Sequence, residues 1–253
     1  MPPLHLRLLL PTLALGLGVA FGYVDWLGLT LTALYLAWVL FTEDHLPRWL
    51  WWGGGLLGGI ALAAHLMPGF QPTPLWPARQ LSPGATPYAL RLSWDKLLLG
   101  LILLAWWLGR LPLPARRPGA ALLVGVATLV AVPLLALSLG LVGWQPKWPQ
   151  QLWLWLAVNL GVAVLAEELL FRAWLQEALV VRLGAAGGIV LTALLFGAAH
   201  IPFSPLFAVV ATVAGLGYGL VFHLSGRLWP ALLLHGAVNA LHVLLLSYPL
   251  RSA

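Results

Sequence analysis

Four polar side chains stand inside long apolar stretches in the second half of the sequence: Glu167, His200, His235 and Asn239. An ionisable group in such a stretch costs about 2.5–3.5 kcal/mol to place in a membrane, so it usually has a function. A carboxylate can take a proton from water while a neutral imidazole holds that water. Imidazole and amide N–H groups can stabilise an oxyanion. These residue types together supply the groups needed to hydrolyse an amide bond.

A second carboxylate and a guanidinium lie close to the first glutamate, in the segment Ala-Glu-Glu-Leu-Leu-Phe-Arg. On a helix, Glu168 and Arg172 are four residues apart and share one face, in the favourable order for an ion pair. Glu167 points about 100° away from Glu168. Two bare carboxylates side by side do not both ionise in a low dielectric. We therefore expect Arg172 to neutralise Glu168 and to leave Glu167 available for chemistry.

The two histidines each lie four residues from a possible supporting side chain. Phe196 precedes His200 by four residues, and His235 precedes Asn239 by four, so each pair shares one helix face. His242 continues the second stripe. Hydrogen bonding between helices would by itself account for Asn239, but it accounts less well for a titratable histidine. The spacing thus predicts inward-facing polar groups on two further helices.

The same side chains are also acceptable zinc ligands, so a metal mechanism is the alternative. Glutamate and two histidines form a known catalytic zinc set, here Glu167, His200 and His235. The sequence has no cysteine, which excludes thiolate ligands and thiol nucleophiles. It also lacks the His-Glu-x-x-His and Gly-x-Ser-x-Gly signatures. We expect no cofactor if the glutamate activates water directly, and zinc otherwise.

The composition places these residues in a membrane protein. Hydrophobic residues make up 61% of the 253 residues and charged residues only 8%, with a mean hydropathy of +0.94. A soluble domain carries about a quarter charged residues, so this chain could not cover its surface in water. Helices satisfy their own backbone in lipid, which predicts an all-α, polytopic transmembrane bundle. The net charge of +6 comes from scattered cations, which suit lipid headgroups and argue against nucleic acid.

Hydropathy predicts eight or nine membrane spans. They cover roughly 6–24, 25–42, 49–67, 97–113, 121–144, 152–176, 186–201, 205–224 and 228–247. The connection 68–96 is rich in proline and cannot form regular helix. We accordingly predict N-terminal transmembrane helices with this loop over 1–150 and a catalytic helical core over 151–253. A multi-pass position in the cell's inner membrane is expected.

Three motifs in this order resemble those of the CPBP intramembrane protease family. They are Glu-Glu-x-x-x-Arg at 167–172, Phe-x-x-x-His at 196–200 and His-x-x-x-Asn at 235–239. This family is the CAAX-prenyl-endopeptidase and bacteriocin-processing group that includes the Ras-converting endopeptidase. The resemblance covers about residues 150–247, and each motif is weak alone whereas the ordered set is specific. Residues 1–150 resemble no family that we can name.

The resemblance implies an intramembrane endopeptidase that cuts a membrane-embedded or membrane-tethered peptide or protein. Glu167 would activate water and His200 would help to bind it, while His235 and Asn239 would hold the oxyanion. The supporting residues would be Glu168, Arg172 and Phe196. The family members differ in substrate, so the resemblance names no particular target.

Two functions from other classes remain open on the sequence alone. Intramembrane Glu, His and Arg residues are also typical of proton-coupled carriers, although the inverted repeats of such carriers are not visible here. A non-catalytic scaffold of the same fold would hold a partner without hydrolysing it. Loss of Glu167 should leave a scaffold functional, and pH-driven flux without proteolysis should mark a carrier.

Overall fold

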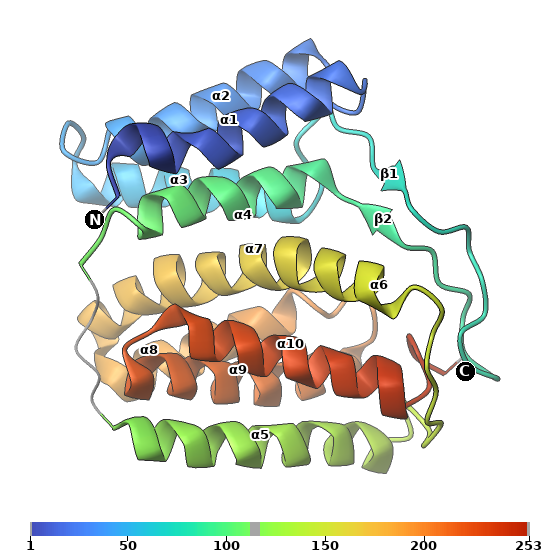
Figure 1. Cartoon of the computed structure of the whole chain (residues 1–253). Coiled ribbons are helices and arrows are strands. Elements are labelled where there is room, and N and C mark those ends of the chain that lie inside the picture. The colour runs from blue at the N-terminus through green and yellow to red at the C-terminus, as the bar shows by residue number, and fades with distance from the viewer. Residues whose placement is uncertain (1, 112–116, 252–253) are drawn as a thin grey trace. The chain divides into compact units, whose positions relative to one another are not determined.

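The computed structural model describes residues 2–111 and 117–251, which are mostly helical (Figure 1). The α-helices are α1 Leu4–Ala20, α2 Trp26–Phe41, α3 Arg48–Ala63, α4 Trp94–Trp107, α5 Pro118–Ser138, α6 Leu152–Val158, α7 Leu165–Glu168, α8 Glu177–Ala198, α9 Pro205–Ser225 and α10 Leu228–Leu245. The π-helical segments are η1 Asn159–Val164 and η2 Leu169–Gln176. The predicted helical architecture is confirmed. One correction applies to "all-α", because β1 Thr73–Pro74 and β2 Arg91–Leu92 pair antiparallel within the proline-rich connection.

Four helical stretches of the described chain are long and apolar enough to cross a membrane. They are Pro118–Ser138, Leu152–Ala198, Pro205–Ser225 and Leu228–Leu245, and shorter apolar helices cover Leu4–Ala20 and Trp26–Phe41. This content supports an integral membrane protein. The number of eight or nine spans is not confirmed and stays a prediction. The predicted end of the fourth span, at 113, lies outside the described residues.

Helix ends follow local capping chemistry. The Asp25 side chain accepts from the backbone N–H of Leu27 at 2.8 Å and of Gly28 at 2.9 Å, so α2 begins there. Ser204 caps α9 in the same way, and Pro205 occupies the first helical position, where its missing N–H costs nothing. A polar cap thus fixes where each of these two apolar helices starts.

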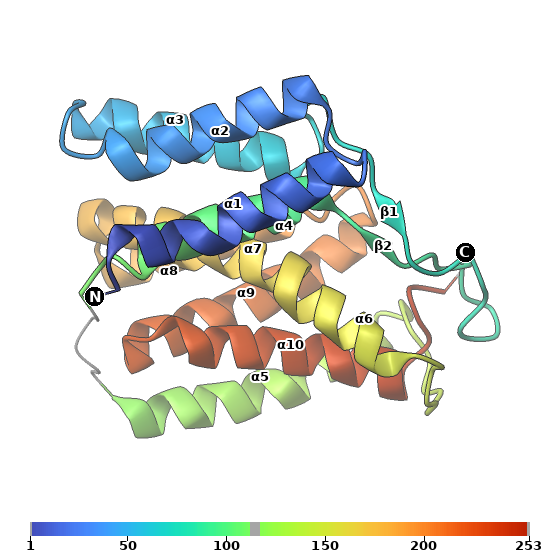
Figure 2. The same ribbon diagram turned by 45° about the horizontal axis from the view of Figure 1, so that its top comes forward.

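One compact unit comprises Met1–Leu75, Arg91–Leu111 and Gly161–Leu170. Within it, α4 packs against α1, α2, α3 and α7, and α1 lies along α4 in Figures 1 and 2. The inward face of α4 is fully buried at Leu98, Leu99, Ile102 and Leu103. Gly100 allows close approach to α7, since a Cβ there would lie 3.4 Å from the Ala166 nitrogen. The helix α4 is therefore the central element of this unit.

The other unit comprises Trp76–Leu90, Pro112–Leu160 and Phe171–Ala253. Here α9 packs against α5, α8 and α10 (Figure 2). The contact with α8 is close at Gly197, where a Cβ would overlap the Thr212 hydroxyl and lie 2.7 Å from the Ala208 carbonyl oxygen. Small residues thus bring these two helices together. Each compact unit combines segments that are far apart in the sequence. The domain boundary predicted at residue 150 stays a prediction.

The long helical run Leu152–Ala198 bends at one glycine. Gly184 has φ 75° and ψ 170°, values outside the helical region that favour glycine over other residues. After the bend, the chain passes close to itself, because a Cβ at Gly188 would lie 2.5 Å from the Val180 nitrogen. The predicted spans 152–176 and 186–201 correspond to the two arms of this run. The second arm ends at Ala198, so His200 lies in the turn that follows rather than within the helix.

Candidate functional site

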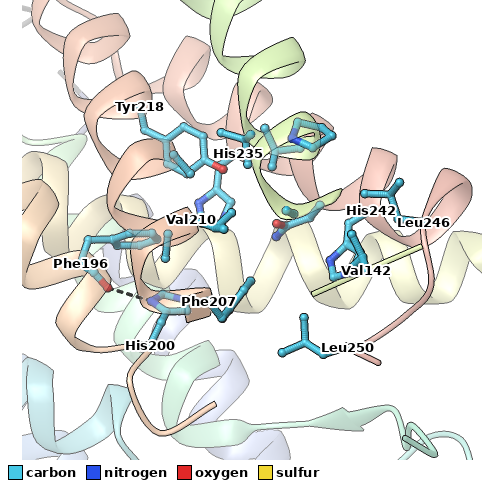
Figure 3. Close-up of a pocket in the computed structure, with 17 residues that line it drawn as sticks. Val142, Phe196, His200, Phe207, Val210, Tyr218, His235, His242, Leu246 and Leu250 are labelled. Carbon is cyan, nitrogen blue, oxygen red and sulfur yellow. Dashed lines mark hydrogen bonds between the residues drawn. The ribbon is translucent and has the colours of Figure 1, made fainter. Parts of the chain in front are cut away.

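A pocket in the second unit brings together three of the four predicted catalytic residues (Figure 3). Its volume is about 80 Å³. Phe196, His200, His235 and Asn239 line it together with apolar side chains from α5 and α9. Three polar groups therefore face one small cavity whose walls are otherwise mainly hydrocarbon. The space is large enough to admit water.

The His200 ring is fixed by the helix that precedes it. Its Nδ1 lies 2.8 Å from the carbonyl oxygen of Phe196, and the contact is drawn in Figure 3. A carbonyl only accepts, so Nδ1 carries the hydrogen and donates it. In the neutral ring, Nε2 then has the lone pair. This tautomer can accept a hydrogen bond from water through Nε2.

The His235 ring is held between aromatic side chains. It stacks on Tyr218 with centroids 4.5 Å apart and an interplanar angle of 17°, and it meets the edge of Phe196 at 5.8 Å. Both His235 and Tyr218 are buried, with 5% and 1% of their surface exposed. Figure 3 shows the two rings side by side on the pocket wall. The orientation of the imidazole is set by packing rather than by solvent.

Asn239 has a polar partner that the sequence analysis missed. Its Nδ2 donates to Oδ1 of Asn159 at 3.2 Å. Asn159 begins the π-helical segment η1, in an otherwise apolar stretch. An amide in such a stretch needs a partner, and this was the signal that could have identified it. The contact fixes the plane of the Asn239 amide and leaves its second N–H available to the pocket.

Phe196 is the aromatic centre of the site. Its ring lies 4.7 Å from that of His200 and 5.1 Å from that of Phe171. The guanidinium carbon of Arg172 lies 5.1 Å from the Phe196 centroid and 5.8 Å from that of Tyr218. Arg172 is fully buried, so these contacts place a cation behind the aromatic wall. Phe196 therefore lies beside both histidines, and Arg172 packs against the two aromatic rings that contact His235.

The C-terminal segment completes the pocket wall with Leu246 and Leu250. The ammonium of Lys147 donates to the Leu246 carbonyl oxygen and, at 3.4 Å, to that of Gln145. Burial lowers the pKa of Lys147 from its usual value. His242, which was only noted as part of the α10 stripe, also lines the pocket, and its Nε2 lies 3.1 Å from the Ser247 carbonyl oxygen. These contacts hold the segment that follows α10.

Glu167 and Glu168 belong to the other compact unit. They lie on α7, a single α-helical turn flanked by the two π-helical segments, and such segments are frequent at functional sites. Oε1 of Glu167 lies 3.5 Å from Nζ of Lys96, at the start of α4. Glu168 is fully buried. No partner for Glu167 was predicted from the sequence, so its contact with Lys96 was missed. The ion pair predicted between Glu168 and Arg172 stays a prediction.

No group of three His, Asp or Glu side chains that could hold a metal ion occurs within either unit, among residues 2–111 and 117–251. The zinc set predicted from Glu167, His200 and His235 draws on both units. It therefore stays a hypothesis for experiment.

Residues 149–241 match the family model of the type II CAAX prenyl endopeptidases, described as Rce1-like. This segment is an Rce1-like domain. The predicted relationship to the CAAX protease family is thereby confirmed. The Rce1-like domain includes all seven predicted site positions, from Glu167 to Asn239, together with Asn159. No curated protein and no solved structure matches the chain at a significant level.

Proposed function

We propose that this protein is an intramembrane endopeptidase that hydrolyses a peptide bond in a prenylated, membrane-tethered CAAX substrate. The observation that carries the proposal is a coincidence of two findings. The Rce1-like match covers 149–241, and within it His200, His235 and Asn239 face one pocket. A scaffold of the same fold would not need these three groups at a common cavity, and the family match favours a protease over a carrier. Integral membrane placement agrees with a lipid-anchored substrate.

In the proposed reaction, Glu167 is the general base. The oxygen of a water molecule bonds to the carbonyl carbon of the substrate, and the water's proton passes to the Glu167 carboxylate. The tetrahedral intermediate then collapses, the carbon–nitrogen bond breaks, and Glu167 returns the proton to the leaving nitrogen. His200 holds the water. The contact of its Nδ1 with the Phe196 carbonyl oxygen supports this role, because in the neutral ring that contact leaves Nε2 to accept from the water.

His235 and Asn239 are the proposed donors to the oxyanion. Donors fixed before the reaction cost no reorganisation when the negative charge develops, and each is worth about 2.7–4 kcal/mol. The stacking of His235 on Tyr218 and the hydrogen bond of Asn239 to Asn159 supply such fixation. Glu168 is proposed to support the site by pairing with Arg172.

We further propose the eight or nine spans predicted from hydropathy and a place in the cell's inner membrane. No cofactor takes part in the proposed route. Zinc held by Glu167, His200 and His235 is the competing mechanism, and it would supply a Lewis acid and a metal-activated water.

Purified protein in lipid vesicles, mixed with a farnesylated peptide ending in a CAAX sequence, tests the proposal. We expect one internal peptide bond of that sequence to be cut, as located by mass spectrometry of the products. An unfarnesylated peptide of the same sequence is the control. Intact peptide after long incubation with folded protein would contradict the proposal. Proton-driven flux through the same vesicles without cleavage would favour the carrier instead.

The same assay separates the two mechanisms. We expect the rate to survive a strong zinc chelator, because the proposed base is a carboxylate and no metal takes part. Loss of activity that only zinc restores would assign the metal mechanism.

A further inference from the structure

Three consecutive residues at the start of α4 each bind a different part of the first unit. The indole N–H of Trp94 donates to the Thr73 hydroxyl at 2.8 Å. Asp95 lies 2.7 Å from Nδ1 of His65, and Lys96 lies 3.5 Å from Glu167. The first turn of α4 is therefore tied to β1, to the end of α3 and to α7. The reaction as proposed above gives these contacts no role.

The two residues that precede the lysine in this turn are firmly anchored. Trp94 is buried, and its ring stacks on Tyr23 with centroids 6.2 Å apart and an interplanar angle of 15°. Asp95 is only 4% exposed, and its Oδ1 also accepts from the backbone N–H of Lys96 at 2.9 Å. His65 is held in the left-handed region, with φ 58°. Such a strained residue persists only where its surroundings require it.

Lys96 itself is partly buried, in the same way as its partner. The side chains of Lys96 and Glu167 are 23% and 18% exposed. A surface ion pair contributes little, because water screens it and both side chains lose freedom. Here the neighbouring contacts of Trp94 and Asp95 already fix the backbone from which Lys96 extends, so only its own side chain remains to be ordered.

We infer that Lys96 is the positioning residue for Glu167, and that the Asp95–His65 contact holds Lys96 in place. The inference rests on the proposed function, in which Glu167 is the general base. A base works only within hydrogen-bond reach of the proton that it takes. A glutamate side chain has several rotatable bonds, and the ammonium at Oε1 restricts them. Lys96 touches neither water nor substrate in this scheme.

Replacing Lys96 with Met tests the inference in the vesicle assay. We expect kcat to fall about 10- to 100-fold, because small displacements of a catalytic group have effects of this size. KM should change less than about 2-fold, since the lysine makes no substrate contact in the scheme. Lys96→Arg should restore kcat to within a few-fold of wild type, because it keeps a cation at the same place. A purely structural lysine would not give this separation of kcat from KM with rescue by arginine.

Arg48→Met is the matched control, because Arg48 is an exposed cation at the start of α3 in the same unit. We expect it to leave kcat unchanged. Wild-type kcat in folded Lys96→Met protein would overturn the inference, and so would equal losses in Lys96→Met and Lys96→Arg. The proposed function fails separately, if wild type itself does not cleave or if Glu167→Gln cleaves normally.

A thermal double-mutant cycle covers the case in which Lys96→Met folds poorly. The shift in Tm caused by Lys96→Met should be smaller in a Glu167→Gln background than in wild type, because the partner charge has already gone. Equal shifts in both backgrounds would show that the two side chains are not coupled and would overturn the inference. This measurement needs no activity.

Discussion

Replacing Glu167 with Gln is expected to lower kcat for the farnesylated CAAX peptide by about 10³-fold or more. A general base contributes about 10²–10⁴-fold to a rate, and glutamine keeps the shape of glutamate but cannot take a proton. The substrate still binds, so KM should change little. Product formation measured by mass spectrometry over hours, in vesicles with equal amounts of folded protein, gives the ratio.

Glu43→Gln makes the same chemical change at another position of the same unit. Glu43 follows α2 and lies 3.8 Å from Arg110. The Glu43→Gln protein should cleave the peptide at the wild-type rate. A Glu167→Gln protein that cleaves within a few-fold of the wild-type rate would remove the general base from the mechanism and leave the scaffold as the better explanation.

His200→Ala is expected to lower kcat by about 10²–10³-fold. The substitution leaves the α9 side of the pocket unchanged. It removes Nε2, the atom that accepts from the water, so the water would no longer be held against the substrate carbonyl. We expect the protein to remain folded, because the ring is only partly buried. Initial rates at saturating peptide measure the loss, and the unfolding temperature checks the fold.

His45→Ala is a close control for this change. His45 also follows a phenylalanine by four residues, and its Nδ1 lies 3.0 Å from the carbonyl oxygen of Phe41, as that of His200 does from Phe196. His45 is exposed in the loop after α2. It should be dispensable, and equal losses for His45→Ala and His200→Ala would contradict a specific role for the pocket histidine.

The helices of this protein were largely predictable from hydropathy, because a membrane-length apolar run has few alternatives to a helix. The predicted spans 25–42, 205–224 and 228–247 differ from α2, α9 and α10 by two residues or fewer at each end. The proline-rich connection was correctly excluded from helix up to residue 93, but its last three residues, 94–96, form the first turn of α4. Its short antiparallel pairing was missed, since two-residue strands leave no periodic pattern.

The pocket residues were predictable for a different reason, which is their chemical contrast with the surrounding sequence. The phenylalanine–histidine spacing alone was not sufficient, because it occurs at both Phe41 and Phe196. The ordered set of three motifs made the distinction, and the pocket contains the second histidine rather than the first.

The partners of the site residues could not be predicted, because they come from distant parts of the sequence. Lys96 precedes Glu167 by 71 residues, and Asn159 precedes Asn239 by 80. An aspartate at a helix start is usually a capping feature, so Asp95 and the lysine after it gave no signal of their contacts with His65 and Glu167. The π-helical geometry on either side of α7 also leaves no mark in an apolar sequence.

The central claim is that Glu167 activates water and does not itself attack the substrate. A single turnover in water labelled with oxygen-18 tests it most directly, with the label located by mass spectrometry in the peptide product and in the enzyme fragment that contains Glu167. We predict one labelled oxygen in the new carboxylate of the product and none in that fragment. If Glu167 attacked instead, it would form an anhydride, and hydrolysis at the glutamyl carbonyl would leave the label in Glu167. Label in the Glu167 fragment, with unlabelled product, would contradict the mechanism.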